Sequence, residues 1–336
     1  MNSVQLAFIV AVAAAVSAGI VLALLPWLKR HALAHPNSRS SHRQSTPQGG
    51  GIAVVAATIA VAAGAVAIGL EPALDPGLLW PVFSATALIA VVGAVDDIRT
   101  IEVVPRLLLQ AIAVAIMIAG LPSELRVLPP IPWLAERALL LLACLWLVNL
   151  TNFMDGIDWM TVAEFVPITA GLTLIGMLGA LPFQGIVVAL ALCGGLLGFA
   201  PFNRPVARVF LGDVGSLPLG LLLGWLLVLV AGNGYVAAAL VLPLYYVADA
   251  SLTLLRRILK REPFWQAHRS HFYQLATDRG FSVPVIVGRV FATNLALVAL
   301  ATASVLWPGA LSAAIALGGG TMLAGWLLYQ FARGKP

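Results

Sequence analysis

The sequence predicts an all-α integral membrane protein, a single bundle of about eleven transmembrane helices over residues 1–336. Two observations predict this fold. The chain is 61% hydrophobic and only 10% charged, whereas about a quarter of the residues of a soluble domain are charged. Its apolar residues also form runs of roughly 20, the length that a helix needs to cross a hydrocarbon core. Membrane barrels alternate apolar and polar residues instead, and this sequence shows no such alternation.

Hydropathy places the transmembrane segments between short polar stretches. Their approximate limits are 4–27, 50–70, 78–95, 104–121, 136–152, 161–181, 184–201, 214–232, 235–256, 284–307 and 309–331. Five polar segments lie between the spans, near residues 28–49, 96–104, 151–161, 202–214 and 256–284. We expect these five segments to carry the chemistry of one membrane domain.

The distribution of Lys and Arg predicts the orientation. All of the 19 Lys and Arg residues except Arg126 and Arg137 fall in the C-terminal tail and in loops on one side of the predicted membrane. Because cytoplasmic loops carry an excess of Lys and Arg, we expect the N-terminus outside and the C-terminus in the cytoplasm. The five polar segments then face the cytoplasm. This topology accounts for the net charge of +5, so no nucleic-acid partner is expected.

Two adjacent carboxylates, Asp96 and Asp97, end the third predicted span. Like charges at a membrane edge repel each other, so this pair favours a nearby cation, either Arg99 or Mg²⁺. A solvated helix end would give the same pattern.

Asn152, Asp155 and Asp158 follow one another at intervals of three residues. On a helix this spacing places them along one face. A row of oxygen ligands suits a hard cation or sugar hydroxyls, and Gly156 beside the row permits a close approach. The alternative is a polar helix terminus in which Asn and Asp act as caps.

Two further carboxylates stand at or inside apolar segments. Asp213 precedes the eighth predicted span between Gly212 and Gly215. It is either the N-cap of that helix or part of a site at which a phosphate or metal reaches the backbone. Asp249 lies inside the ninth apolar run, where a carboxylate is either functional or the structural partner of a neighbouring Arg.

Two segments combine basic side chains, hydroxyls and imidazoles in a way that suits anions. The first contains Asn37, Arg39, Ser40, Ser41 and His42, ahead of three consecutive glycines at 49–51. The second contains His268, Arg269 and His271 and suits a polyanion such as pyrophosphate. A basic cytoplasmic loop would explain the charges without any ligand.

In this order the segments resemble a known family, the polyprenyl-phosphate N-acetylhexosamine-1-phosphate transferases of glycosyltransferase family four. The resemblance extends from about Pro36 to Gln274. It consists of Pro-Asn-x-Arg-Ser-Ser-His, Thr-Pro-x-Gly-Gly-Gly, Asp-Asp, Asn-Phe-Met-Asp-Gly-Ile-Asp, Phe-Leu-Gly-Asp-x-Gly-Ser and His-Arg-x-His, in family order. One such match would carry little weight, whereas the ordered set on one predicted side of the membrane is specific.

The resemblance implies a reaction. The family transfers a sugar-1-phosphate from a UDP-sugar to undecaprenyl phosphate and releases UMP, with Mg²⁺ as cofactor; tolerance of Mn²⁺ is also expected. We therefore expect a phosphoglycosyltransferase with an N-acetylhexosamine donor in a bacterial inner membrane. The chain resembles the branch that initiates O-antigen and other surface polysaccharides, as in lipopolysaccharide and cell wall biogenesis, more than it resembles the muropeptide branch. A homodimer is usual for the family.

The resemblance also implies roles for residues. The expected catalytic residues are Asp96, Asp97, Asp213, His268 and His271. The expected substrate-binding residues are Asn37, Arg39, Ser40, Ser41, His42, Asn152, Asp155, Asp158 and Arg269. Within these sets, Asp213 and Asp155 are the expected Mg²⁺ ligands, and Asp96 is the expected general base, which Asp97 supports. Trp159 and Met160 depart from the family pattern, and this departure bears on the donor sugar rather than on the reaction.

Two other functional classes stay open at this point. A transporter would carry polar groups near the bilayer midplane, often in two related halves. Here the carboxylates of the polar segments lie at one predicted face, and Asp249 is the exception because it lies inside an apolar run. A polyprenyl-phosphate phosphatase would use a similar site without a nucleotide, so release of UMP separates it from a transferase. For the transferase, direct attack by the acceptor phosphate is favoured over an aspartyl-phosphate intermediate, which the sequence does not exclude.

Overall fold

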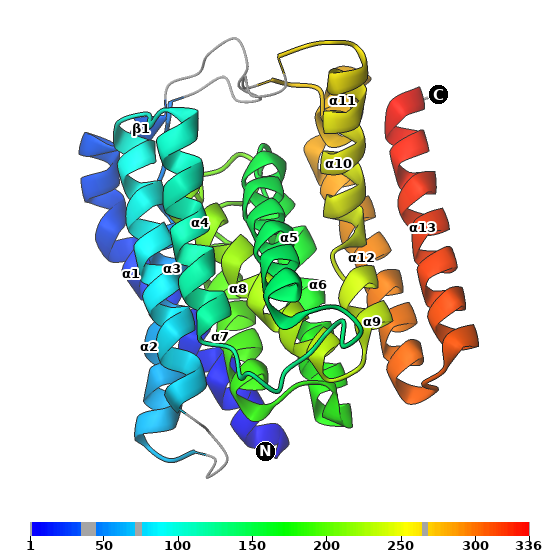
Figure 1. The fold of residues 1–336 in the computed structure, drawn as a ribbon. Helices are drawn as coiled ribbons and strands as arrows, with labels where there is room; N and C mark the ends of the chain where they lie inside the picture. Colours follow the sequence, from blue (N-terminus) through cyan, green and yellow to red (C-terminus); the bar gives the residue numbers. More distant parts are fainter. Residues whose placement is uncertain (1, 35–44, 71–75, 264–267, 336) are drawn as a thin grey trace.

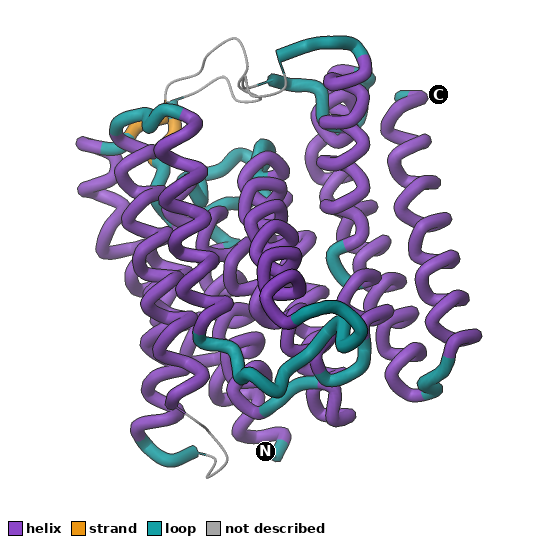
Figure 2. The backbone as a smooth tube through the Cα atoms, viewed as in Figure 1, coloured by secondary structure: helices purple, strands orange, loops and turns teal. Residues whose placement is uncertain are grey.

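The computed structural model describes residues 2–34, 45–70, 76–263 and 268–335, which form a bundle of helices (Figures 1 and 2). The helices are α1 Ser3–His31, α2 Gly51–Ala67, α3 Pro76–Ile98, α4 Val103–Ala119, α5 Trp133–Met154, α6 Met160–Ile175, α7 Phe183–Phe199, α8 Asp213–Gly232, α9 Val236–Val241, α10 Leu244–Leu259, α11 Phe272–Asp278, α12 Val283–Leu306 and α13 Ala310–Arg333. A π-helical turn, η1 Gly176–Ala180, extends α6. Two short strands, β1 Leu33–Ala34 and β2 Thr46–Pro47, pair antiparallel. The all-α prediction is confirmed.

Most predicted spans correspond to one helix each. Seven described helices are long and apolar enough to cross a membrane, and α2, α4 and α7 are shorter apolar helices. The predicted span 235–256 is an exception, because α9 ends at Val241 and α10 begins only at Leu244. Pro243 lies at this break, and proline has no backbone N–H with which to continue a helix. The total number of crossings and the side on which each terminus lies stay predictions.

Helix α8 occupies the centre of the bundle (Figure 1). Every residue from Val214 to Ala231 is buried, and α2, α3, α5 and α9 pack around the helix. A helix that is apolar on all sides is stable only when other apolar elements surround it. Helices at the periphery, such as α1, α12 and α13, instead expose apolar side chains, which suits a lipid surrounding. The first turn of α8 is therefore fixed from several directions.

The loop between α4 and α5 explains why Arg126 and Arg137 lie on the predicted side of the membrane that carries no other Lys or Arg. The carboxylate of Glu136, in the first turn of α5, is fully buried and accepts hydrogen bonds from Arg126 and from two backbone N–H groups of the loop. Arg137 donates to the carbonyl oxygens of Pro122 and Leu125, at 2.7 and 3.1 Å. Both arginines thus hold the loop against the end of the bundle.

Substitution of Glu136 tests this account of the loop. Glu136→Ala would leave the guanidinium of Arg126 and two N–H groups without their acceptor, which should lower the free energy of unfolding by about 2–3 kcal/mol. The measurement is the thermal midpoint of the detergent-solubilised protein. Glu124→Ala is the control, because Glu124 is exposed in the same loop and its side chain bonds only Ser123 and its own backbone N–H. Equal midpoints for the two variants would contradict the account.

Candidate active site

The N-terminus of α8 is held by a carboxylate from α3. Asp97 accepts the N–H of Asp213 on Oδ1 at 2.9 Å and the N–H of Val214 on Oδ2 at 3.1 Å. These two N–H groups belong to the first helical turn, so they have no partner within the helix and form its positive end. The side chain of Gln48 in turn donates to the carbonyl oxygen of Asp97 at 2.7 Å. Asp97 therefore sets the position of Asp213.

Glycines allow the neighbouring helices to touch the first turn of α8. A Cβ on Gly51 of α2 would lie 2.2 Å from the Cα of Gly215, and a Cβ on Gly93 of α3 would lie 2.3 Å from the carbonyl oxygen of Asp213. Gly212 has a φ of +76°, a left-handed conformation that favours glycine. The sequence interpretation left the space beside Gly212 and Gly215 for a ligand, whereas protein atoms fill it in the structure.

The side chain of Asp213 meets two other polar segments. Asn152, near the end of α5, donates from Nδ2 to Asp213 Oδ1 at 2.6 Å and to Ser216 Oγ at 3.0 Å. The carboxyl group of Asp96 also interacts with that of Asp213. The structure thus brings together the Asp96–Asp97 pair, Asn152 and Asp213, which lie far apart in the sequence.

Asp96 is paired with a residue that the sequence interpretation missed. Its Oδ2 lies 2.9 Å from Nη1 of Arg106, in the first turn of α4, and its Oδ1 accepts the N–H of Ile101 at 2.6 Å. The sequence had indicated Arg99 or a metal as the partner. The signal for Arg106 was a charge at the start of an apolar span, close behind a carboxylate pair.

The predicted row of Asn152, Asp155 and Asp158 on one helix face is wrong. Helix α5 ends one residue before Asp155, and the chain turns before α6 begins. The three side chains therefore reach different partners. Asn152 contacts α8, Asp155 accepts a hydrogen bond from the Thr161 hydroxyl, and Asp158 accepts the N–H of Ala207 at 3.0 Å.

Desolvation raises the pKa values of both carboxyl groups in this turn. For Asp155 it raises the pKa to about 7, to which the charges of Asp97 and Asp158 add, while the bond from Thr161 opposes the rise. Burial raises the pKa of Asp158 to about 6, against the effect of the N–H of Ala207. A cation that binds next to Asp155 would consequently compete with a proton near neutral pH.

The turn after α5 is fixed on two sides. The N–H of Trp159 donates to Asn203 Oδ1 at 2.8 Å, and its indole Nε1 donates to the carbonyl oxygen of Ala200 at 2.6 Å. On the other side, a Cβ on Gly156 would lie 2.1 Å from the hydroxyl oxygen of Tyr273. The missing side chain at Gly156 therefore leaves room for Tyr273 of α11 and not for the ligand that the sequence suggested. The indole N–H of Trp159 already donates to a backbone carbonyl of the protein.

Asp249 anchors the late polar segment. It is buried, and its carboxylate accepts the N–H of Phe272 at 3.0 Å and the N–H of Tyr273 at 3.2 Å, the first two N–H groups of α11. Its Oδ1 also lies 3.3 Å from Nδ1 of His271. Of the two sequence interpretations of Asp249, the structural one is supported, although its partners are His271 and backbone rather than an Arg.

The His-Arg-x-His segment is packed around this anchor. The ring of His268 stacks on that of His271 with centroids 4.9 Å apart, and its Nδ1 lies 2.9 Å from Ser270 Oγ. Burial, together with His271 and a nearby guanidinium, lowers the pKa of His268 to about 4, so its imidazole is neutral at pH 7. Arg269 pairs with Asp278 at 2.9 Å.

Five predicted substrate-binding residues, Asn37, Arg39, Ser40, Ser41 and His42, lie outside the described residues. The chain that follows them is placed: Phe210 donates its N–H to the carbonyl oxygen of Pro47 at 2.8 Å, and Gly50 donates to that of Phe210 at 2.9 Å. This pairing holds the three-glycine segment beside the start of α8.

The chemistry of these carboxyl groups would suit a divalent cation that takes its other ligands from water and substrate. Among the residues that the structure describes, no group of three or more His, Cys, Asp or Glu side chains forms a cation cage. Mg²⁺, however, is usually held by one or two carboxylates together with water and substrate phosphates. The interaction between the carboxyl groups of Asp96 and Asp213 would suit that mode, because a cation between two such groups would offset their mutual repulsion.

Comparison with known proteins finds a family whose match includes the residues around the start of α8. Glycosyl transferase family 4 matches residues 79–231. A probable undecaprenyl-phosphate N-acetylglucosaminyl 1-phosphate transferase of Bacillus subtilis is 27% identical over 324 residues, 87% of this chain and 86% of that protein. A decaprenyl-phosphate N-acetylglucosaminephosphotransferase of Mycolicibacterium smegmatis is 29% identical, over 57% of this chain and 52% of that protein. A phospho-N-acetylmuramoyl-pentapeptide-transferase of Leuconostoc citreum is 32% identical, over 53% and 60%.

Two glycines of α2 provide a matched test of the packing at the start of α8. In Gly51→Ala the new Cβ would overlap the backbone of Gly215, which cannot move aside as a flexible side chain can, so a loss of about 2–3 kcal/mol of stability or more is expected. In Gly64→Ala nothing lies within 4 Å of the new Cβ, and the helix should gain up to about 1 kcal/mol. Thermal midpoints in detergent measure both. Two variants of equal stability would contradict the close contact.

Proposed function

Because the chain belongs to glycosyl transferase family 4, we propose that it transfers a sugar-1-phosphate from a UDP-sugar to a polyprenyl phosphate and releases UMP. The observation that carries this proposal is the convergence of Asp96, Asp97 and Asp213 at the start of α8, inside the region that the family matches. The names of the relatives support the acceptor class and an N-acetylhexosamine in the donor.

The reaction requires charge neutralisation more than covalent help from the protein. An oxygen of the acceptor phosphate forms a bond to the phosphorus that carries the sugar. The bond from that phosphorus to the bridging oxygen breaks, and UMP leaves with this oxygen. Mg²⁺, when bound, would neutralise charge on the pyrophosphate and on the leaving UMP. Since the acceptor phosphate is already anionic, we favour direct attack over an intermediate on an aspartate.

We assign the residues of α3, α5 and α8 to different tasks. Asp213 would hold the cation, and Asn152 would orient its carboxyl group through the bond at 2.6 Å. Asp97 is a positioning residue, because both of its oxygens already bind the first turn of α8. Asp96 stays the candidate base, and its ion pair with Arg106 holds its carboxylate in place. Asp155 is proposed as a second cation ligand.

The surroundings follow from the same proposal. We propose a bacterial inner membrane with the carboxyl site at the cytoplasmic face, where soluble UDP-sugar and lipid-held acceptor can meet. Figure 1 shows the two termini at opposite ends of the bundle, as the predicted orientation requires. The neutral imidazole of His268 and its partner His271 would contact the pyrophosphate as hydrogen-bonding groups. A homodimer and a role in initiating surface polysaccharides complete the proposal.

The direct test is nucleotide release. Membranes that contain the protein are incubated with a panel of UDP-N-acetylhexosamines and undecaprenyl phosphate, with and without Mg²⁺, and UMP is measured. UMP formation that needs both the acceptor and Mg²⁺ is expected. Release of inorganic phosphate from the acceptor without UMP would contradict the proposal and indicate a phosphatase.

Asp213→Asn should lower UMP formation by about 100-fold or more, because it removes the charge that holds the cation. The variant keeps the backbone N–H that binds Asp97, so its thermal midpoint should stay close to that of the parent. Glu102→Gln is the control, since Glu102 is an exposed carboxylate next to the site and its side chain caps nothing. Full activity of Asp213→Asn would rule out the assignment of the cation to this residue.

The raised pKa of Asp155 predicts a pH dependence. Below pH 7 the carboxyl group is mostly protonated and neutral, so the apparent affinity for Mg²⁺ should fall as the pH drops from about 8 to 6. The side chain in Asp155→Asn cannot ionise. This variant should therefore need more Mg²⁺ for half-maximal UMP formation, and the concentration it needs should not change over this pH range. The check is the Mg²⁺ concentration for half-maximal UMP formation at each pH. The same steep dependence in both proteins would show that another group titrates.

A further inference from the structure

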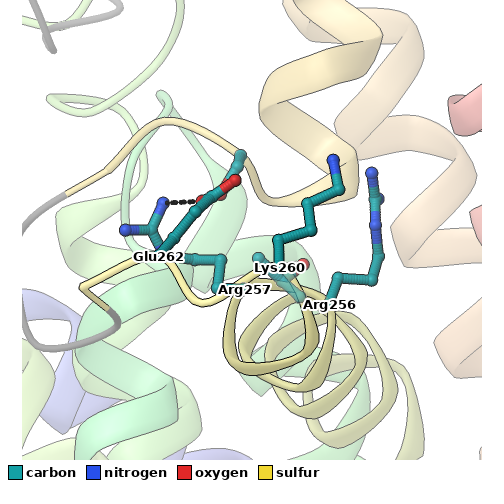
Figure 3. Close-up of a pocket in the computed structure, with 6 residues that line it drawn as sticks. Arg256, Arg257, Lys260 and Glu262 are labelled. Carbon is teal, nitrogen blue, oxygen red and sulfur yellow. Dashed lines mark ion pairs between the residues drawn. The ribbon is translucent and has the colours of Figure 1, made fainter.

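A small, open pocket lies at the C-terminal end of α10 (Figure 3). Its lining residues are Thr253, Arg256, Arg257, Lys260, Glu262 and Ser270. None of these side chains takes part in the proposed reaction. Three of the six are cationic, whereas Glu262 is the single carboxylate of this lining.

The charges of the pocket are only partly balanced. Arg257 forms an ion pair with Glu262 at 2.9 Å, drawn as the dashed line in Figure 3. Arg256 and Lys260 lie one helical turn apart and extend in the same direction (Figure 3). Among the placed residues, neither side chain makes a hydrogen bond or an ion pair. The guanidinium of Arg256 lies 5.2 Å from the centre of the Phe272 ring, a contact that positions it without using its N–H donors.

An apolar row runs along α10 next to these cations. Leu252, Leu255 and Leu259 are 44%, 50% and 74% exposed, and the spacing of three and four residues places them on one side of the helix. Leu252 lies one turn before Arg256, so the row leads directly to the basic end. An exposed apolar row that ends in cationic side chains is the pattern of a helix that contacts both the acyl chains and the headgroups of lipids.

We propose that this pocket binds the phosphate of an anionic glycerophospholipid, with Arg256 and Lys260 on the phosphate and the acyl chains along Leu252, Leu255 and Leu259. The apolar row favours a lipid over a soluble anion, because a nucleotide or free phosphate would leave it uncovered. The pocket shares no residue with the carboxyl site, to which the acceptor phosphate must come in the proposed reaction. The inference does not depend on that reaction.

The test is a titration of the delipidated full-length protein in detergent. Dioctanoyl phosphatidylglycerol and dioctanoyl phosphatidylcholine are added separately, and the apparent Kd of each is taken from the shift in thermal midpoint. The glycerol lipid should bind about tenfold or more tightly than the choline lipid. In Arg256→Gln/Lys260→Gln this preference should disappear. Arg261→Gln should keep it, because Arg261 is the next residue along the chain and carries the same charge but does not line the pocket.

Four outcomes would overturn the proposal. Equal affinity for the two lipids in the parent protein would show that only acyl chains are bound. A shift of the same size with inorganic phosphate that is lost in the double variant would assign the pocket to a soluble anion. Tighter binding of farnesyl phosphate than of phosphatidylglycerol, again lost in the double variant, would assign it to the acceptor. A preference that survives in the double variant would place the lipid elsewhere; each variant is compared with its own midpoint without lipid, so a loss of stability alone does not obscure the result.

Discussion

The structure depends on how the first turn of α8 is satisfied. This helix is buried along its length, so the N–H groups at its start cannot rely on water, and an unpaired buried N–H costs free energy. The carboxylate of Asp97 accepts two of them. That solution fixes the end of α3 against α8, and the contact of Gly51 with Gly215 fixes α2 against the same turn. Asp213 then has one position in the bundle, from which its side chain meets Asn152 and Asp96.

The same device recurs in the second half of the chain. Asp249, buried in α10, accepts the first two N–H groups of α11 as Asp97 does for α8. Through this cap, His271 and Tyr273 are held against the turn that contains Gly156. Asp97 and Asp249 therefore serve the backbone, and other carboxyl groups, above all Asp213, are left for chemistry. Aspartates at or inside apolar segments thus have two different roles here. Asp97 and Asp249 cap helices, whereas Asp213 is a candidate cation ligand.

Sequence alone predicted the fold class and most spans, because hydropathy over a window reports burial in lipid or protein. Sequence alone failed where a single residue determines whether a helix continues or ends. Pro243 interrupts the ninth span although its surroundings stay apolar. The row at Asn152 required α5 to continue, whereas the helix ends at Met154. The motif residues at 96–97, 152 and 213 were recognised, but their partners Gln48 and Arg106 were not, because long-range pairs depend on how helices are placed against one another.

The central claim is that the carboxyl groups at the start of α8 hold the cation of a phosphosugar transferase. The most direct measurement is the anomalous scattering of Mn²⁺ in crystals of the protein grown with a UDP-N-acetylhexosamine. The account predicts a peak beside the carboxyl group of Asp213, in contact with the pyrophosphate of the nucleotide sugar, and no such peak in Asp213→Asn. A peak at another group of side chains, or a bound nucleotide sugar with no cation near Asp213, would contradict it.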